Sequence, residues 1–105
     1  MKKLIFFLLL SSFSFGKDYF VYIASESDDT VSLIKFDGKN TTEIERIPVG
    51  IKFSEIEGPH GITIDPSGDY WYLSLAHGNP YGSLTKFSTQ TNKAVAKTEL
   101  GIFPA

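Results

Sequence analysis

Polar and apolar positions along most of the chain follow the periods of short β-strands. Residues 30–36 alternate polar and apolar side chains, which is the pattern of a half-buried strand. Residues 19–24 and 70–76 are rich in aromatic and β-branched side chains, which strands favour. Four further segments have the same character, at residues 43–49, 61–65, 83–88 and 93–100. No segment has the capped, amphipathic pattern of a helix, so the chain after Gly16 is predicted to be all-β.

Turn-forming residues separate these segments. Short turns are expected at residues 37–40, 66–69 and 89–92, and a longer loop at residues 77–82. The segment 43–49 is more polar than the others and has Pro48 near its end. Both features are typical of a strand at the edge of a sheet.

Two stretches of the chain match each other at an offset of 51 residues. Residues 36–50 and 87–101 both run from Phe to Gly over fifteen positions, and the preceding tetrapeptides, 32–35 and 83–86, also match. A fixed period of this size is typical of stacked supersecondary units that bury their apolar faces against one another. Residues 61–100 hold four of the predicted strands, and a four-stranded meander of about 40 residues has the size of a propeller blade.

Several linked motifs follow one another along the chain. Residues 58–68 read GPHGITIDPSG, and the tetrapeptides 22–25 and 72–75 hold equivalent places. Residues 29–34 and 47–50 follow in the first unit. Together these motifs resemble the first-strand signature, the name-giving tetrapeptide and the last two strands of the YVTN family of β-propeller repeats.

The resemblance implies propeller blades, each a four-stranded antiparallel meander with strands A to D. Strands B–D of a first blade would cover about residues 19–50, strands A–D of a second about 58–101, and a third blade would begin at 102–105. Propellers typically close with about 4–8 blades. The resemblance therefore implies an N-terminal fragment of about two blades in an incomplete ring, or several short chains that build a ring together. The sequence departs from the family pattern at Trp71, which replaces an aliphatic residue, and in the insertion 52–57.

The start of the chain has the pattern of a secretory signal peptide over residues 1–16. Lys2 and Lys3 precede an unbroken apolar run, and the small residues Ser14 and Gly16 favour cleavage after Gly16. The alternative is a membrane anchor, but the apolar run is shorter than the roughly 20 residues that a spanning helix needs. We therefore expect a periplasmic or secreted protein with no membrane span after cleavage.

The composition excludes several kinds of site and partner. The chain contains no Cys, which excludes disulfides, thiolate metal sites and lipoprotein attachment. Its formal net charge is −2, and loss of Lys2 and Lys3 with the signal peptide would make it −4. A mildly acidic domain with no basic cluster is a poor match for nucleic acid.

Candidate binding residues fall on the connections between strands. In a propeller, the D-to-A and B-to-C connections surround the mouth of the central channel, and ligand groups commonly collect on such loops. Here these connections are residues 25–29, 52–60 and 77–82. They carry Glu26, Glu55 and the candidates for a binding face, which are Asp28, Asp29, Glu57, His60, His77 and Tyr81. The opposite face is expected to carry only short turns.

His60 and His77 are candidate ligands for a metal or haem, because imidazole binds copper, zinc and iron. Other blades would then complete the site, since no third ligand occurs at a matching spacing. The alternative is that His60 hydrogen-bonds a neighbouring blade and His77 lies in solvent. Ser25, Ser27 and Ser74 have no His/Asp arrangement around them, and no glycine-rich phosphate loop occurs.

Two functions are consistent with these residues. The first is a non-catalytic periplasmic binding or scaffold module without a cofactor, which presents its loop face to a protein or small-molecule partner. The second is a redox enzyme or accessory propeller with copper or haem bound near His60 and His77. Propellers that resemble this family include the haem-binding domain of cytochrome-type nitrite reductases and the copper-cluster domain of nitrous oxide reductase. The missing catalytic and metal motifs favour the first.

Overall fold

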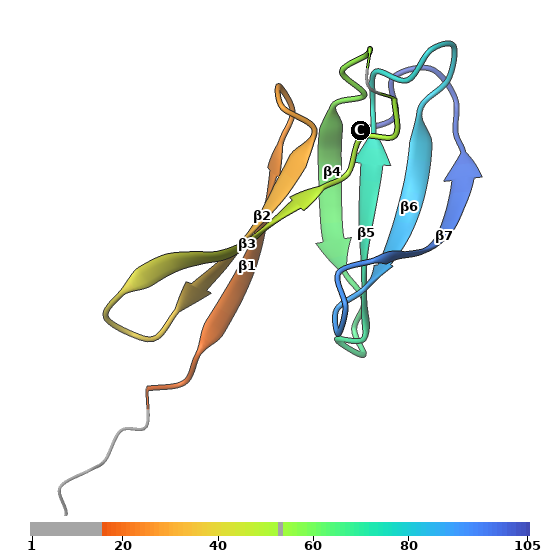
Figure 1. The fold of residues 1–105 in the computed structure, drawn as a ribbon. Helices are drawn as coiled ribbons and strands as arrows, with labels where there is room; N and C mark the ends of the chain where they lie inside the picture. Colours follow the sequence, from red (N-terminus) through yellow and green to blue (C-terminus); the bar gives the residue numbers. More distant parts are fainter. Residues whose placement is uncertain (1–15, 53) are drawn as a thin grey trace, which may run out of the picture.

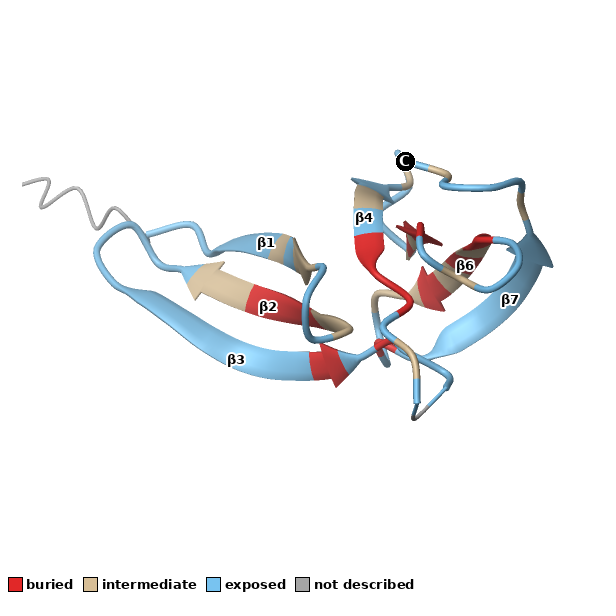
Figure 2. Cartoon of the chain, turned by 90° about the horizontal axis from the view of Figure 1, so that it is seen from above, coloured by how far each residue is buried: buried red, intermediate tan, exposed pale blue. Residues whose placement is uncertain are grey.

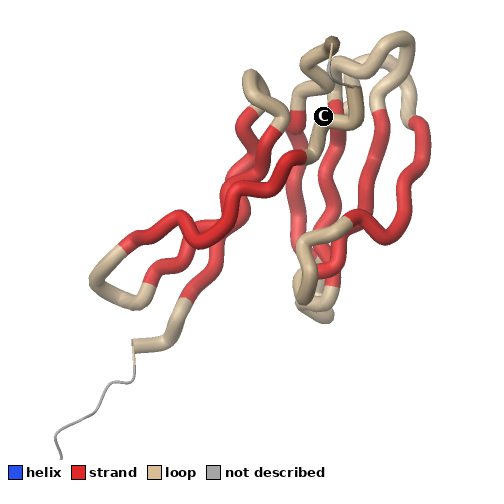
Figure 3. Tube along the Cα trace, viewed as in Figure 1, coloured by secondary structure: helices blue, strands red, loops and turns tan. Residues whose placement is uncertain are grey.

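The computed structural model describes residues 16–52 and 54–105. The predicted signal peptide therefore lies outside the described residues, apart from Gly16. Seven strands follow one another (Figure 3), namely β1 (Tyr19–Ser25), β2 (Thr30–Phe36), β3 (Thr41–Pro48), β4 (Pro59–Ile64), β5 (Tyr70–Leu75), β6 (Ser83–Ser88) and β7 (Ala94–Glu99). The described residues form no helix, and accordingly none with the length and apolar character to cross a membrane.

The strands form two antiparallel sheets in which each strand pairs with the next one along the chain (Figure 1). The first sheet has the order β1-β2-β3 and the second the order β4-β5-β6-β7. The all-β prediction is confirmed, and each predicted strand is present with its bounds within two residues. The edge position predicted for residues 43–49 is also confirmed, because β3 ends its sheet.

The two sheets differ in the hairpin that leads to their last strand. Phe36 pairs with Thr41 across the turn after β2, whereas Phe87 pairs with Ala94 across the turn after β6. The second turn is longer by two residues and includes Asn92 in a left-handed conformation, with φ at 54°. The gap-free match of the two units at a constant offset of 51 residues therefore does not hold beyond this turn, since β7 is displaced by two or three residues relative to β3.

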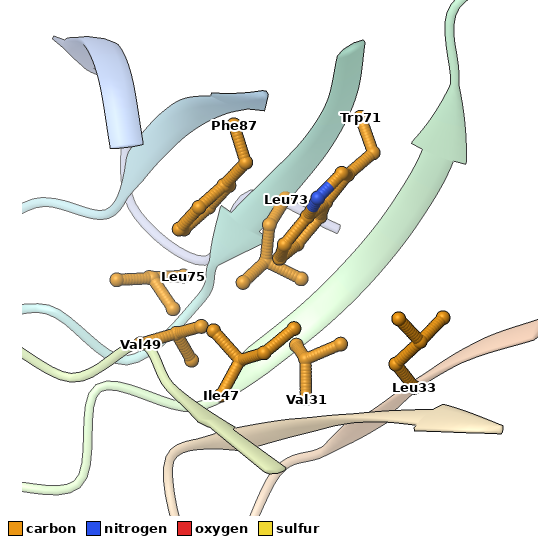
Figure 4. Packing of buried hydrophobic residues seen from close by; sticks show 8 residues of the cluster. All are labelled: Val31, Leu33, Ile47, Val49, Trp71, Leu73, Leu75 and Phe87. Atoms are coloured by element: carbon orange, nitrogen blue, oxygen red, sulfur yellow. The ribbon is translucent and has the colours of Figure 1, made fainter. Parts of the chain in front are cut away.

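The two sheets pack face to face, and the apolar core lies between them (Figure 4). Trp71 on β5 has no exposed surface, and its ring stacks on Tyr22 of β1 and Phe87 of β6 at centroid distances of 4.8 and 3.9 Å. Stacking of aromatic rings stabilises the core beyond the contribution of their buried surface area. The buried cluster takes residues from both sheets, namely Val31, Leu33, Ile47, Val49, Trp71, Leu73, Leu75 and Phe87.

The sheets meet at one end and diverge toward the other (Figures 1 and 2). Burial on the first sheet is concentrated at the start of β2 and the end of β3. Residues 41–46 of β3 are all exposed, and so are Tyr19 and Phe20 at the start of β1. The packed end is the one where the connections between the sheets lie, and the site described next is built there.

Candidate functional site

Four segments gather at the packed end of the two sheets, and we call this region the loop end (Figure 1). It comprises the turn 26–29, the linker 49–58, the loop 76–82 and the C-terminal segment 100–105. Side-chain contacts join the turn to both the linker and the loop, as described below. In addition, Lys52 Nζ donates a hydrogen bond to the carbonyl of Asn79 at 3.1 Å. The structure thus brings together the three connections that the sequence analysis assigned to one face.

Asp29 fastens the linker to the first sheet. Its carboxylate accepts hydrogen bonds from the backbone N–H groups of Glu57 at 2.9 Å and Gly58 at 2.8 Å. Its own carbonyl accepts a bond from the N–H of Val49 at 2.9 Å. Because these acceptors are occupied by backbone donors, Asp29 serves to hold the linker and has little capacity left for a ligand. Its neighbour Asp28 is exposed and accepts only a local bond from the Thr30 hydroxyl at 2.9 Å.

Glu57 is a buried carboxylate, with 5% of its surface exposed. One carboxylate oxygen accepts hydrogen bonds from the backbone N–H groups of Ile51 and Lys52, the latter at 3.1 Å. A buried charge is tolerated when such donors satisfy it. Glu57 therefore folds the linker back on itself, and it is not presented to solvent as a binding residue.

His77 and Glu26 are joined by a hydrogen bond between the two sheets. The imidazole Nε2 lies 2.5 Å from Glu26 Oε1, and the ring meets Phe103 edge-on at a centroid distance of 5.5 Å. The backbone N–H of His77 also donates to the carbonyl of Glu57 at 2.8 Å. The residue beside Glu57 must be small, because a Cβ at Gly58 would collide with the His77 ring.

The electrostatic partners of Glu26 include both histidines of the chain. The hydrogen bond from His77 holds the pKa of the Glu26 carboxyl below its ordinary value, and the charges of His77 and His60 act in the same direction. His60 lies on β4 with its side chain exposed. Within residues 16–52 and 54–105, however, no group of three or more His, Asp or Glu side chains is arranged to hold a metal ion. The structure therefore brings the two histidines to the same region without a three-ligand cluster among the described residues.

Tyr81 lies at the loop end with 48% of its surface exposed. Two hollows of about 370 Å³ each adjoin the loop 76–82. One is lined by His77 and Phe103, the other by Tyr81 and Lys52. Of the candidate residues, His77, Tyr81 and Glu57 thus border concave surface at the loop end, whereas Asp29 is engaged in holding the linker.

The sequence analysis missed the role of Asn92, which it placed in an ordinary turn of the opposite face. The Asn92 Oδ1 atom accepts hydrogen bonds from the Tyr22 hydroxyl at 2.7 Å and from the Trp71 indole N–H at 3.2 Å. The Asn92 side-chain NH₂ donates to Glu45 Oε2 at 2.7 Å. The sequence does contain one indication, the indole N–H of Trp71, since a buried Trp usually needs a hydrogen-bond acceptor. The acceptor could not be identified without the register of the two sheets.

Comparison with known proteins does not identify a family for this chain. No protein-family model and no curated protein matches this chain. The resemblance to YVTN repeats therefore stays a prediction from the motifs, and the functional argument rests on the contacts described above.

Proposed function

We propose that this chain contributes blades to an exported β-propeller that acts as a periplasmic binding or scaffold module, with the loop end as its binding surface. Three observations support the proposal. The described residues form two antiparallel meanders packed face to face, as neighbouring blades do. The connections that carry the candidate residues gather at one end. The charged and aromatic side chains there lie beside hollows of about 370 Å³, a size that suits small ligands or a protruding partner segment.

The main observation in support of the proposal is an apolar face of β1 that none of the described residues covers. Tyr22 and Tyr72 hold equivalent places in the matching tetrapeptides, so Val21 and Ile23 are equivalent to Trp71 and Leu73. Trp71 and Leu73 have no exposed surface because the first sheet covers them, whereas Val21 and Ile23 are 49% and 48% exposed. Since repeat units bury such faces against the next unit, the face of β1 is suited to a further blade.

That further blade would belong either to the same polypeptide or to another copy. Contact between unlike faces of successive units is heterologous, and such contacts close into rings when the rotation per unit permits. In both arrangements the further blade covers the same apolar face of β1. The two arrangements differ in the mass of the smallest stable species.

The binding role is tested by site-specific photo-crosslinking in the source cells. Tyr81 at the loop end and Lys39 in the turn at the opposite end are each replaced with p-benzoylphenylalanine. A binding loop end gives discrete crosslinked products from position 81 and none from position 39, because only the former lies beside the hollows. Equal labelling at both positions, or none at position 81, would contradict a binding role for this surface.

The propeller assignment is tested separately by the native mass of the exported protein. We expect a species several-fold heavier than the 11.7 kDa of this chain, from a longer polypeptide or from several copies. A stable monomer of 11.7 kDa or slightly less would contradict it. Metal analysis and a visible absorption spectrum of the same sample test the alternative function, a redox propeller. Bound copper or haem would favour redox chemistry at His60 and His77.

A further inference from the structure

A further concave surface lies between the outer strands of the two sheets and reaches the first residues of the linker. It is a groove of about 470 Å³ between β3 with its following residues on one side and the β6–β7 hairpin on the other. The buried residues Ile47, Val49 and Phe87 line it. Small-molecule sites in proteins commonly have about this volume and an apolar lining.

Two lysines border the same groove. Lys97 pairs directly with Thr85 and Ala94 pairs directly with Phe87, so the antiparallel register puts Lys97 on the face that carries Phe87. Lys93 lies in the turn just before β7 and also lines the groove. Neither lysine forms an ion pair with a residue that the structure describes; the ion pairs there involve Lys35, Arg46, Lys52 and His77.

The groove also has one acidic residue, on the side opposite the two lysines. Glu45 is the one carboxylate among the lining residues, and its Oε2 atom accepts the bond from the Asn92 side-chain NH₂ at 2.7 Å. The hydroxyls of Thr85 and Thr91 add neutral donors to the lining. The groove therefore offers an apolar floor and two lysine ammonium groups without carboxylate partners on one bank.

We propose that this groove binds a small organic anion with an apolar body, such as an aromatic or aliphatic carboxylate or sulfonate. The apolar body lies against Ile47, Val49 and Phe87, and the anionic group lies at Lys93 and Lys97. Charge complementarity selects an anion over a neutral or cationic ligand of the same shape. The site does not depend on the proposed ring, because its lining residues all lie within the described part of this chain.

The test uses a matched pair of probes on the exported protein. The anionic probe is 8-anilinonaphthalene-1-sulfonate, and the uncharged probe of similar shape is N-phenyl-1-naphthylamine. Two variants are compared with the natural chain by fluorescence titration. They are Lys93→Gln/Lys97→Gln in the groove and Lys39→Gln in the remote turn after β2 as a matched loss of lysine charge.

We expect the double lysine variant to bind the anionic probe about fivefold to tenfold more weakly, as expected from losing two partly exposed charge contacts. Its affinity for the uncharged probe should not change. The Lys39 variant should bind the anionic probe like the natural chain. The three lysines are all at exposed positions, and circular dichroism checks that the variants remain folded.

Two results would overturn the proposal. The first is an unchanged Kd for the anionic probe in the double lysine variant, which would place the probe on another surface. The second is equal weakening of both probes in that variant, which would mean that charge has no role.

Discussion

The side chain of Asn92 connects three strands through one amide group. It accepts from the Tyr22 hydroxyl and the Trp71 indole, and it donates to Glu45. These partners lie on β1, β5 and β3, so the amide spans both sheets. The residue has a φ of 54°, which Asn tolerates better than most other side chains. Conformation and hydrogen bonding therefore both favour Asn at this position.

Replacing Asn92 should destabilise the protein because the buried indole N–H of Trp71 loses its hydrogen-bond acceptor. In Asn92→Gly the backbone keeps its freedom to adopt a positive φ, but the Trp71 N–H and the Tyr22 hydroxyl lose their acceptor. We expect a loss of about 1–3 kcal/mol in the free energy of unfolding, measured in urea. Asn92→Ala should lose somewhat more, because Ala is also strained in the left-handed region. Wild-type stability in Asn92→Gly would show that the three bonds contribute nothing.

Tyr22 gives the packing between the sheets a dependence on alkaline pH. Burial raises the pKa of the Tyr22 hydroxyl, and the nearby charge of Glu45 raises it further. The unfolded chain releases this proton at about pH 10, while the folded chain retains it to a higher pH. The contribution to stability is therefore fully present below about pH 10 and is lost as the pH rises through the raised pKa.

We expect the free energy of unfolding to fall more steeply above pH 10 in the natural chain than in Tyr22→Phe. Urea unfolding of both proteins between pH 8 and 11 measures this difference. The other tyrosines are common to both proteins and cancel in the comparison. Parallel profiles would show that Tyr22 titrates alike in the folded and unfolded chains.

At the scale of elements, the strands could be predicted because each one carries its own signal. Residues 30–36 and 83–88 were assigned with the observed bounds, since alternation of polar and apolar side chains is a local property. The length of the turn after β6 was not predicted. It depends on the left-handed conformation of Asn92 and on bonds to strands far away in sequence, which a pattern in one segment does not contain.

The central strand β5 should dominate the stability of the packed sheets. Trp71 is fully buried and stacks on rings from both sheets, so Trp71→Ala should cost about 3–5 kcal/mol in urea unfolding. Val95 on β7 is 54% exposed, and Val95→Ala should cost no more than about 0.5 kcal/mol. His77→Ala removes a contact with the exposed carboxylate of Glu26 and should cost far less than Trp71→Ala. Equal losses at Trp71 and His77 would contradict the assignment of the core.

At the scale of the whole molecule, the convergence of the connections could be predicted, but the roles of their residues could not. Meanders place alternate turns at opposite ends, so the turn 26–29 and the loop 76–82 had to lie at corresponding ends of their sheets. Asp29 and Glu57 were expected to face a ligand. Instead they hold backbone N–H groups of the linker, and that use depends on how the linker folds in three dimensions.

Unequal packing along the molecule predicts unequal hydrogen exchange. The sheets are joined at the loop end, where Val31 and Ile47 are buried, and they diverge toward Phe36 and Thr41. Local opening is easiest where few apolar contacts cover the backbone bonds. Amides near Phe36 and Thr41 should therefore exchange markedly faster than those near Val31 and Leu75, as measured by mass spectrometry of peptide fragments.

The same measurement distinguishes the single chain from the proposed assembly. In a chain dissociated with mild denaturant, β1 should exchange quickly, because its face with Val21 and Ile23 has no cover among the described residues. In the native species, a further blade over that face should slow exchange in β1 while leaving β5 and β6 unchanged, since their cover comes from within the chain. Identical exchange of β1 in both samples would mean that its apolar face stays exposed, and the argument for a further blade would fail.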